Sequence, residues 1–217
     1  MPLTIHYVSV FNQEDILIPQ SDLIDSEYVQ TKCPVHNHKQ SRTFVATSPI
    51  DFNFNINRTP DQNFISCSRP ELLEYDDEHI NSPKPVIQLV FPKFLFFTEE
   101  DNIWFEFYDH PMTALKNNFI CMSGWFNLSN WSRMSSTAIT LVNEKKSVII
   151  EKGDPLFRVS FYPPNLDESI VLKKENNREV VRQWVDAHSK ISEKDWRPRL
   201  FSKTETESKC PFSFLFK

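Results

Sequence analysis

Only two glycines, Gly124 and Gly153, occur in this chain of 217 residues, against fifteen prolines. Glycine-rich loops let the backbone approach a phosphate group closely, so their absence excludes the dinucleotide-binding and Walker-type nucleotide sites. The turns must instead be formed by proline, asparagine, aspartate and serine, which preset φ or hydrogen-bond to their own backbone. Such turns favour a β-rich fold with many irregular loops.

Apolar and polar residues alternate in several short segments, as expected for strands with one buried face. The clearest examples are residues 52–56, 103–107 and 157–161. Segments such as "TFVAT" and "PVIQLV" are more evenly apolar, which fits strands buried on both faces. About ten such segments with turn signals between them predict a mainly β chain. We expect an antiparallel barrel or a jelly-roll-like sandwich rather than βαβ units.

One segment has helical periodicity instead. Near residues 175–189, apolar residues such as Val181 and Trp184 recur on one face, and charged residues such as Arg178 and Arg182 occupy the other. This pattern predicts one C-terminal α-helix.

The chain length fits one β-rich domain spanning residues 1–217. The acidic, proline-bearing stretch 69–85 is predicted to be a solvated loop at one end of the barrel. Residues 190–217 end in "PFSFLFK", which would form a sticky patch if it were exposed, so we expect this segment to dock on the domain or on a neighbouring subunit. A homo-oligomer would follow from the second arrangement.

The formal net charge of −5 gives no general attraction to phosphate backbones or anionic membranes, so nucleic acid is disfavoured as a partner and no membrane partner is expected. No apolar stretch reaches the roughly 18 residues that span a bilayer, and the N-terminus lacks the pattern of a signal peptide. We therefore expect a cytoplasmic location with reduced cysteines.

A metal site is one interpretation of "KCPVHNHK", where Cys33, His36 and His38 follow the spacing Cys-x2-His-x-His. On an extended segment the two histidines point to the same side, and imidazole with thiolate is a good zinc ligand set. Cys210 could complete four ligands if the C-terminal segment docks nearby. The alternative is a polar loop with exposed histidines. We expect no cofactor, with zinc, or iron in an unusual ligand set, as the alternative.

A ligand site is one interpretation of "GWFNLSNWSR", where Trp125, Trp131 and Arg133 could stack a base and hold a phosphate. The alternative places both tryptophans in the core or at the rim of the barrel. No complete catalytic motif is present, since there is no GxSxG elbow, and Cys121 lies in an apolar run typical of a buried, inert thiol. We assign no catalytic residue.

The segment 148–164, "VIIEKGDPLFRVSFYPP", resembles the hairpin of the trimeric deoxyuridine triphosphatases and deoxycytidine triphosphate deaminases. The resemblance implies a β-barrel. Those enzymes also carry a glycine-flanked Asp or Tyr motif and, in the former, a glycine-rich C-terminal arm. A chain whose glycines are Gly124 and Gly153 contains neither, so the activity is not implied.

Most of the chain resembles a broad group of uncharacterised proteins of tailed phages, notably those of marine cyanobacteria, and of some bacteria. Its pattern appears here as Cys33-Pro34, Gly124-Trp125-Phe126, "EKGDP" at 151–155 and Cys210-Pro211-Phe212, in that order. The resemblance implies a β-barrel in a phage context, either in the cytoplasm of an infected host cell or in the virion. It implies no mechanism.

These observations predict a non-catalytic binding protein encoded by a phage, acting as a virion component or as an effector on a host factor. Its partner would be a phage or host protein. The alternative is a metal- or nucleotide-dependent enzyme that uses residues 33–38 or 125–133, or a barrel that sequesters a small nucleotide.

Overall fold

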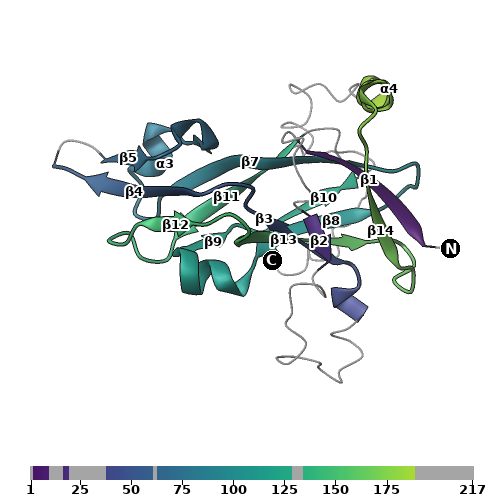
Figure 1. Cartoon of the computed structure of the whole chain (residues 1–217), viewed down its shortest axis with the longest axis horizontal. Coiled ribbons are helices and arrows are strands. Elements are labelled where there is room, and N and C mark those ends of the chain that lie inside the picture. Colours follow the sequence, from purple (N-terminus) through teal and green to yellow (C-terminus); the bar gives the residue numbers. More distant parts are fainter. Residues whose placement is uncertain (1, 10–16, 20–37, 61–62, 129–133, 189–217) are drawn as a thin grey trace, which may run out of the picture.

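The computed structural model describes residues 2–9, 17–19, 38–60, 63–128 and 134–188, and within these the chain is mainly β (Figure 1). The strands are β1 (Leu3–Ser9), β2 (Leu17–Pro19), β3 (Thr43–Thr47), β4 (Phe52–Arg58), β5 (Asn63–Cys67), β6 (Leu73–Glu74), β7 (Val86–Phe97), β8 (Trp104–Asp109), β9 (Phe119–Cys121), β10 (Gly124–Asn127), β11 (Ser135–Leu141), β12 (Val148–Ile150), β13 (Pro155–Tyr162) and β14 (Ile170–Lys174). Besides the helical residues 38–40, the helical segments are η1 (Pro70–Leu72), α3 (Asp77–Ile80), the π-type turn η2 (Thr113–Asn117) and α4 (Arg178–His188).

The strands form three sheets. Sheet A has the order β14-β1-β7-β11-β9, with β6 beside β7, and sheet B has the order β10-β8-β13-β3-β2. Sheet C consists of β12, β4 and β5, of which β4 and β5 extend to one end of the molecule in Figure 1. Neighbouring strands are antiparallel except β1 and β14, which pair in parallel near the opposite end. The predicted antiparallel architecture is therefore confirmed, with one parallel pair added.

Phenylalanine rings join sheets A and B. Phe96 of sheet A contacts Phe105 and Phe161 of sheet B, with ring centroids 5.5 and 5.2 Å apart. Phe94 meets Phe157 in an edge-on arrangement at 6.2 Å. All five rings are buried in the core of the sandwich, and those of Phe105, Phe157 and Phe161 are the ones that the sequence alternation predicted.

The predicted C-terminal helix is confirmed as α4, which follows β14. The side-chain oxygen of Asn177 accepts a hydrogen bond of 3.0 Å from the Glu179 amide, which satisfies one of the free donors at the start of a helix. Trp184 is half-buried, and its ring lies 5.3 Å from that of Phe97. In the described part of the chain, no helix is both long and apolar enough to cross a bilayer.

The acidic stretch 69–85 contains short elements rather than a continuous loop. It comprises η1, β6 and α3, and β6 pairs with β7 through Leu73 and Glu74. Leu72, Leu73 and Ile80 are buried, so apolar side chains anchor this otherwise exposed stretch to the sandwich. Residues 190–217, predicted to dock, lie outside the described residues.

Candidate functional site

The outward face of sheet B carries the most distinctive cluster of polar and aromatic side chains. In β8 and β13 the phenylalanines point inward, so the residues between them point outward. The register places outward residues side by side, because Glu106 pairs with both Trp125 and Ser160, and Ser160 pairs with Thr43. We call this layer of side chains the polar face, although its central members Thr43, Tyr108 and Ser160 are buried. It consists of Thr43, Trp104, Glu106, Tyr108, Trp125, Arg158, Ser160 and Tyr162, with Lys39 and Arg42 from the segment before β3.

An aromatic pair lies on one side of the polar face. The rings of Trp125 and Tyr162 stack with centroids 4.6 Å apart and an interplanar angle of 27°. The Tyr162 hydroxyl donates a 2.8 Å hydrogen bond to Oε2 of Glu106, and this bond fixes the orientation of the Tyr162 ring. Burial and the neighbouring Glu106 carboxylate raise the pKa of Tyr162, so its ring stays neutral. Trp125 is 52% exposed and can stack on a further planar group.

A chain of hydroxyl groups holds the centre of the polar face. Ser160 Oγ lies 2.8 Å from the Tyr108 hydroxyl and 2.7 Å from Thr43 Oγ1, and Thr43 donates to the Lys39 carbonyl at 2.9 Å. Each hydroxyl has one proton, so Ser160 must donate to Thr43 and Tyr108 to Ser160. These bonds fix the relative positions of β3, β8 and β13.

Cationic groups surround these hydroxyls. The guanidinium carbon of Arg158 lies 4.3 Å from the centroid of the Tyr108 ring, and Nζ of Lys39 lies 5.0 Å from it. Arg158 also donates from Nε to the Asp109 carbonyl at 2.8 Å. Across the described residues, no salt bridge involves Lys39, Arg42 or Arg158. The polar face therefore carries positive charge that no carboxylate in the described part of the chain neutralises by direct contact.

Arg42 is the most unusual of these cations. It is only 6% exposed, its Nε donates to the His38 carbonyl at 3.4 Å, and its guanidinium carbon lies 6.0 Å from the Tyr162 ring centroid. Its buried Nη1 has no hydrogen-bond partner among the described residues. Arginine does not lose its proton in proteins, so this site holds a buried positive charge with an unsatisfied donor.

His110, next to the end of β8, adds no charge at neutral pH. Burial and, after it, the nearby Arg158 lower its pKa to about 4, against the opposing effect of Asp109. The neutral ring accepts a hydrogen bond from the Met112 amide to Nδ1 at 3.3 Å. The positive charge near this end of the polar face comes from lysine and arginine alone.

The "EKGDP" turn is occupied by structural contacts. Gly153 has a φ of +91°, in the left-handed region that favours glycine, and joins β12 to β13. Asp154 accepts hydrogen bonds from Lys116 at 2.7 Å, from the Asn117 amide group at 2.8 Å and from the Glu151 backbone at 3.1 Å. Its carboxylate thus attaches the hairpin to η2, and its oxygens are used by the chain itself.

Three side chains singled out in the sequence are described, namely Trp125, Cys121 and His38. Trp125 lies on the polar face, while its predicted partners Trp131 and Arg133 lie outside the described residues. Cys121 is buried, its thiol donates to the Leu156 carbonyl at 3.2 Å, and burial raises its pKa, as expected for an inert thiol.

The predicted metal ligands Cys33, His36 and Cys210 also lie outside the described residues. The fourth, His38, is described, and its Nε2 lies 3.8 Å from an Asp167 carboxylate oxygen. Within the described part of the chain, no three His, Cys, Asp or Glu side chains gather as a metal site would require. The metal site stays a prediction.

Sequence reasoning missed Arg42, Arg158 and Tyr162. The last two are part of the pattern Arg-x-Ser-x-Tyr at 158–162, whose polar residues alternate with apolar ones and so mark the second face of β13, on which Ser160 is itself buried. That signal was available in the sequence. No local sequence pattern predicts the burial of Arg42, because that burial depends on how β3 packs beside β13.

No family model matches this chain, and no curated protein matches it. Among solved structures, it is similar to the native dUTPase of EIAV, with a TM-score of 0.37 and 11% identity, covering 80% of this chain and 98% of that one. It is also similar to a mutant dUTPase of Staphylococcus bacteriophage 80alpha with dUpNHpp, with a TM-score of 0.34 and 10% identity, covering 64% and 78%. These are distant likenesses to the dUTPase barrel, too weak to assign a function.

Proposed function

We propose that this protein is a non-catalytic binding protein whose polar face holds a planar, anionic ligand of the nucleotide type. The observation that carries the proposal is Arg42, a nearly buried guanidinium with an unsatisfied donor, in contact with the ring of Tyr162. A planar group would stack on the face of Trp125 that points away from Tyr162, so Tyr162 would lie between Trp125 and Arg42.

The energetics of Arg42 support an anion. Burying a charge without a partner costs several kcal/mol, on the order of the effective penalty per ion in proteins. A phosphate oxygen near the guanidinium would supply both the counter-charge and the missing hydrogen-bond acceptor. Lys39 and Arg158, which both lie against the Tyr108 ring, would add to the attraction.

The stacked pair of Trp125 and Tyr162 supports a planar ligand, and Glu106 favours one class of base over another. Stacking a base on an aromatic side chain contributes about 1 to 3 kcal/mol. Glu106 lies between the strands of Trp125 and Tyr162 and already accepts from the Tyr162 hydroxyl at Oε2. Its remaining acceptor capacity favours a base that carries an exocyclic amino group over one that does not.

A titration of the full chain with nucleoside monophosphates tests this proposal, using calorimetry at low salt. We expect binding to weaken about 5- to 100-fold in Trp125→Ala, from the loss of stacking. Phe64→Ala is the matched control, because Phe64 is an aromatic residue that is 41% exposed on β5 of sheet C and lies outside the polar face. Equal losses in the two variants, or no binding by the unaltered protein, would contradict the proposal.

Arg42→Met provides a second, independent readout. Replacing a buried, unpaired charge with an apolar side chain of similar length often leaves stability unchanged or raises it. We expect the unliganded variant to melt at the same temperature as the parent or a few degrees higher, while the ligand-induced rise in melting temperature is lost. A variant that is less stable and still binds would show that Arg42 is purely structural.

The biological setting we propose rests on the phage-like sequence pattern described above. In it, the protein acts in the cytoplasm of an infected cell as an effector that retains a host nucleotide or a host factor displaying one. A virion component is the other form of this proposal, and mass spectrometry of purified particles distinguishes the two. Self-association is compatible with either, and sizing of a chain ending at Lys209 would show whether "CPFSFLFK" contributes.

The rival proposal is a zinc or iron enzyme that uses Cys33, His36, His38 and Cys210. Elemental analysis of protein purified without an affinity tag tests it directly. About one equivalent of metal, lost in His36→Ala, would favour this proposal, and metal-free protein would remove it.

A further inference from the structure

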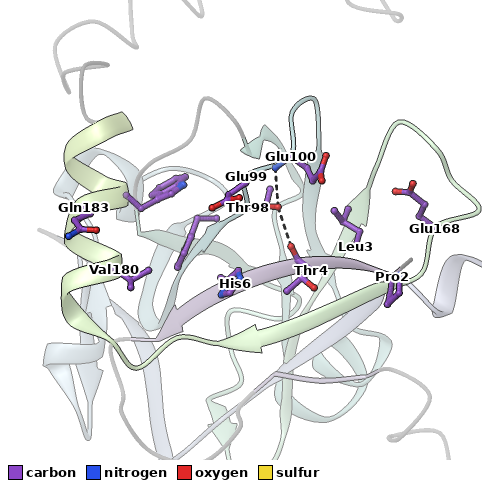
Figure 2. Close-up of a pocket in the computed structure, with 12 residues that line it drawn as sticks. Pro2, Leu3, Thr4, His6, Thr98, Glu99, Glu100, Glu168, Val180 and Gln183 are labelled. Atoms are coloured by element: carbon purple, nitrogen blue, oxygen red, sulfur yellow. Dashed lines mark hydrogen bonds between the residues drawn. The ribbon is translucent and has the colours of Figure 1, made fainter.

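A groove of about 730 Å³ lies beside β1 of sheet A (Figure 2), and none of its lining residues belongs to the polar face. β1 and the turn after β7 form its floor and one wall, α4 closes one end, and the turn before β14 bounds the other. Its lining divides into an aromatic end at α4 and an acidic side along the turn after β7.

The aromatic end is a row of three rings in contact, of which the first two are stacked and the third is tilted. His6 lies nearly parallel to Phe97, with centroids 5.3 Å apart and an interplanar angle of 22°. Phe97 in turn contacts Trp184 of α4 at 5.3 Å. Val180, one turn earlier on α4, also lines this end. The helix therefore contributes an indole and an aliphatic side chain to a wall that the strands alone would leave incomplete.

The acidic side carries three carboxylates. Glu99 and Glu100 come from the turn after β7, and Glu168 comes from the turn before β14. Thr98 holds the first of these turns in place, because its hydroxyl donates to the Thr4 carbonyl at 3.1 Å and accepts from the Glu100 amide at 3.3 Å. These bonds keep both glutamates beside β1, as the dashed lines in Figure 2 show.

Basic groups are absent from the lining itself. None of the twelve described residues that line the groove is lysine or arginine. Glu175 adds a fourth carboxylate nearby, with Oε2 3.7 Å from Nδ1 of His6. Lys173, which pairs with His6 across β1 and β14, is exposed and does not line the groove. The groove therefore combines negative charge with aromatic faces.

We propose that this groove binds an alkylammonium group, with its charge beside the carboxylates that line the groove, Glu99, Glu100 and Glu168, and its carbon chain against Trp184. Aromatic faces attract cations through their quadrupole, and carboxylates add direct charge attraction. An anionic ligand would meet only repulsion here, and an uncharged apolar ligand would leave the carboxylates without a counter-charge. This site is independent of the nucleotide site on sheet B.

Two kinds of ligand carry an alkylammonium group: a free polyamine, and a lysine side chain of a protein partner. Calorimetry on the full chain at low salt, with spermidine and with an eight-residue peptide of alternating lysine and glycine, distinguishes them. The control ligand is the same peptide with every lysine acetylated, which keeps the length and removes the charge. We expect at least one cationic probe to bind, and the acetylated peptide to bind at least tenfold more weakly.

Variants connect the binding to the groove. We expect the double variant Glu99→Gln with Glu100→Gln to bind about 5- to 20-fold more weakly, from two partly exposed charge contacts. Trp184→Leu should weaken binding about 2- to 30-fold, the range of a single cation–π contact. Glu71→Gln is the matched control, since Glu71 is an exposed glutamate on η1 and does not line the groove.

Three results would overturn the proposal. They are failure of both cationic probes to bind at millimolar concentration, equal binding of the acetylated peptide, and equal weakening in Glu71→Gln and the double glutamate variant. The glutamine substitutions are at exposed positions, so the proposal remains testable even if Trp184→Leu does not fold. Nucleotide binding can be measured on the same preparations, so failure at one site is separable from failure at the other.

Discussion

Asp154→Ala should lower the free energy of unfolding by about 3 kcal/mol at neutral pH. The carboxylate accepts hydrogen bonds from Lys116, from Asn117 and from the Glu151 backbone. A hydrogen bond to a charged group contributes roughly 1.5 to 3 kcal/mol, and the three contributions are not additive because they share one carboxylate. Asn117 is fully buried, so removing its acceptor leaves an unsatisfied donor in the interior. Urea denaturation followed by circular dichroism measures the change.

The control for this measurement is Asp101→Ala, because Asp101 is exposed on the turn after β7. Surface substitutions of this kind usually change stability by less than about 0.5 kcal/mol. If the two variants unfold at the same denaturant concentration, the contacts of Asp154 contribute nothing to stability and the structural assignment of the "EKGDP" turn is wrong.

The stabilisation from Asp154 should also depend on pH. Burial acts to raise the pKa of this carboxyl group, but the hydrogen bonds from Lys116, the Glu151 amide and Asn117 together outweigh it, so the pKa lies below its ordinary value. The ionised form is therefore favoured in the folded state, and its contribution is complete above the unfolded pKa of about 3.9. It is lost as the pH falls from there through the folded pKa, so the gap between parent and Asp154→Ala should narrow in acid.

Phe96→Ala should lower the free energy of unfolding by about 4 kcal/mol, which exceeds the expected effect of Asp154→Ala. Phe96 is almost fully buried, and its ring contacts Phe94 in its own sheet and Phe105, Phe107 and Phe161 in sheet B. Alanine would remove the contacts between the sheets and leave a cavity that neighbouring rings cannot fill completely. Phe96→Leu, which retains most of the volume, should cost less than half as much.

The matched control is Phe64→Ala on β5, where the phenylalanine is 41% exposed. Its substitution should cost below about 1 kcal/mol, because part of its surface already contacts water. Both variants are measured by denaturant unfolding at neutral pH. A similar cost at the two positions would show that Phe96 does not occupy the core between sheets A and B.

The sequence predicted local features well, because periodicity reports which face of an element is buried. Alternation in 103–107 and 157–161 identified core phenylalanines on β8 and β13, and helical spacing identified α4 to within a few residues of its start. The evenly apolar "TFVAT" is β3, whose five residues are all buried. The anchoring of 69–85 was missed because single buried leucines in an acidic stretch produce no period.

The candidate site was only partly predictable. Trp125 was identified from its own neighbourhood, but the stack partner Tyr162 is 37 positions away and comes beside it only through strand pairing. Arg42 is polar and adjoins a strand, which in sequence is typical of a solvated residue. In the structure Arg42 is buried and makes no salt bridge with a carboxylate of the described residues. Both properties follow from tertiary packing, which a local sequence pattern does not predict. The same reason hid the groove, whose walls come from opposite ends of the chain.

The pairing of β1 with β14 means that part of sheet A forms late during folding. Leu3 lies opposite Ile170, so β1 finds its parallel neighbour only after β14 has been synthesised. Contacts between such distant positions carry a large loop-closure cost and form slowly. The groove also needs Trp184, which lies later still. During synthesis, the proposed cation site would therefore appear only after the phenylalanine core can form.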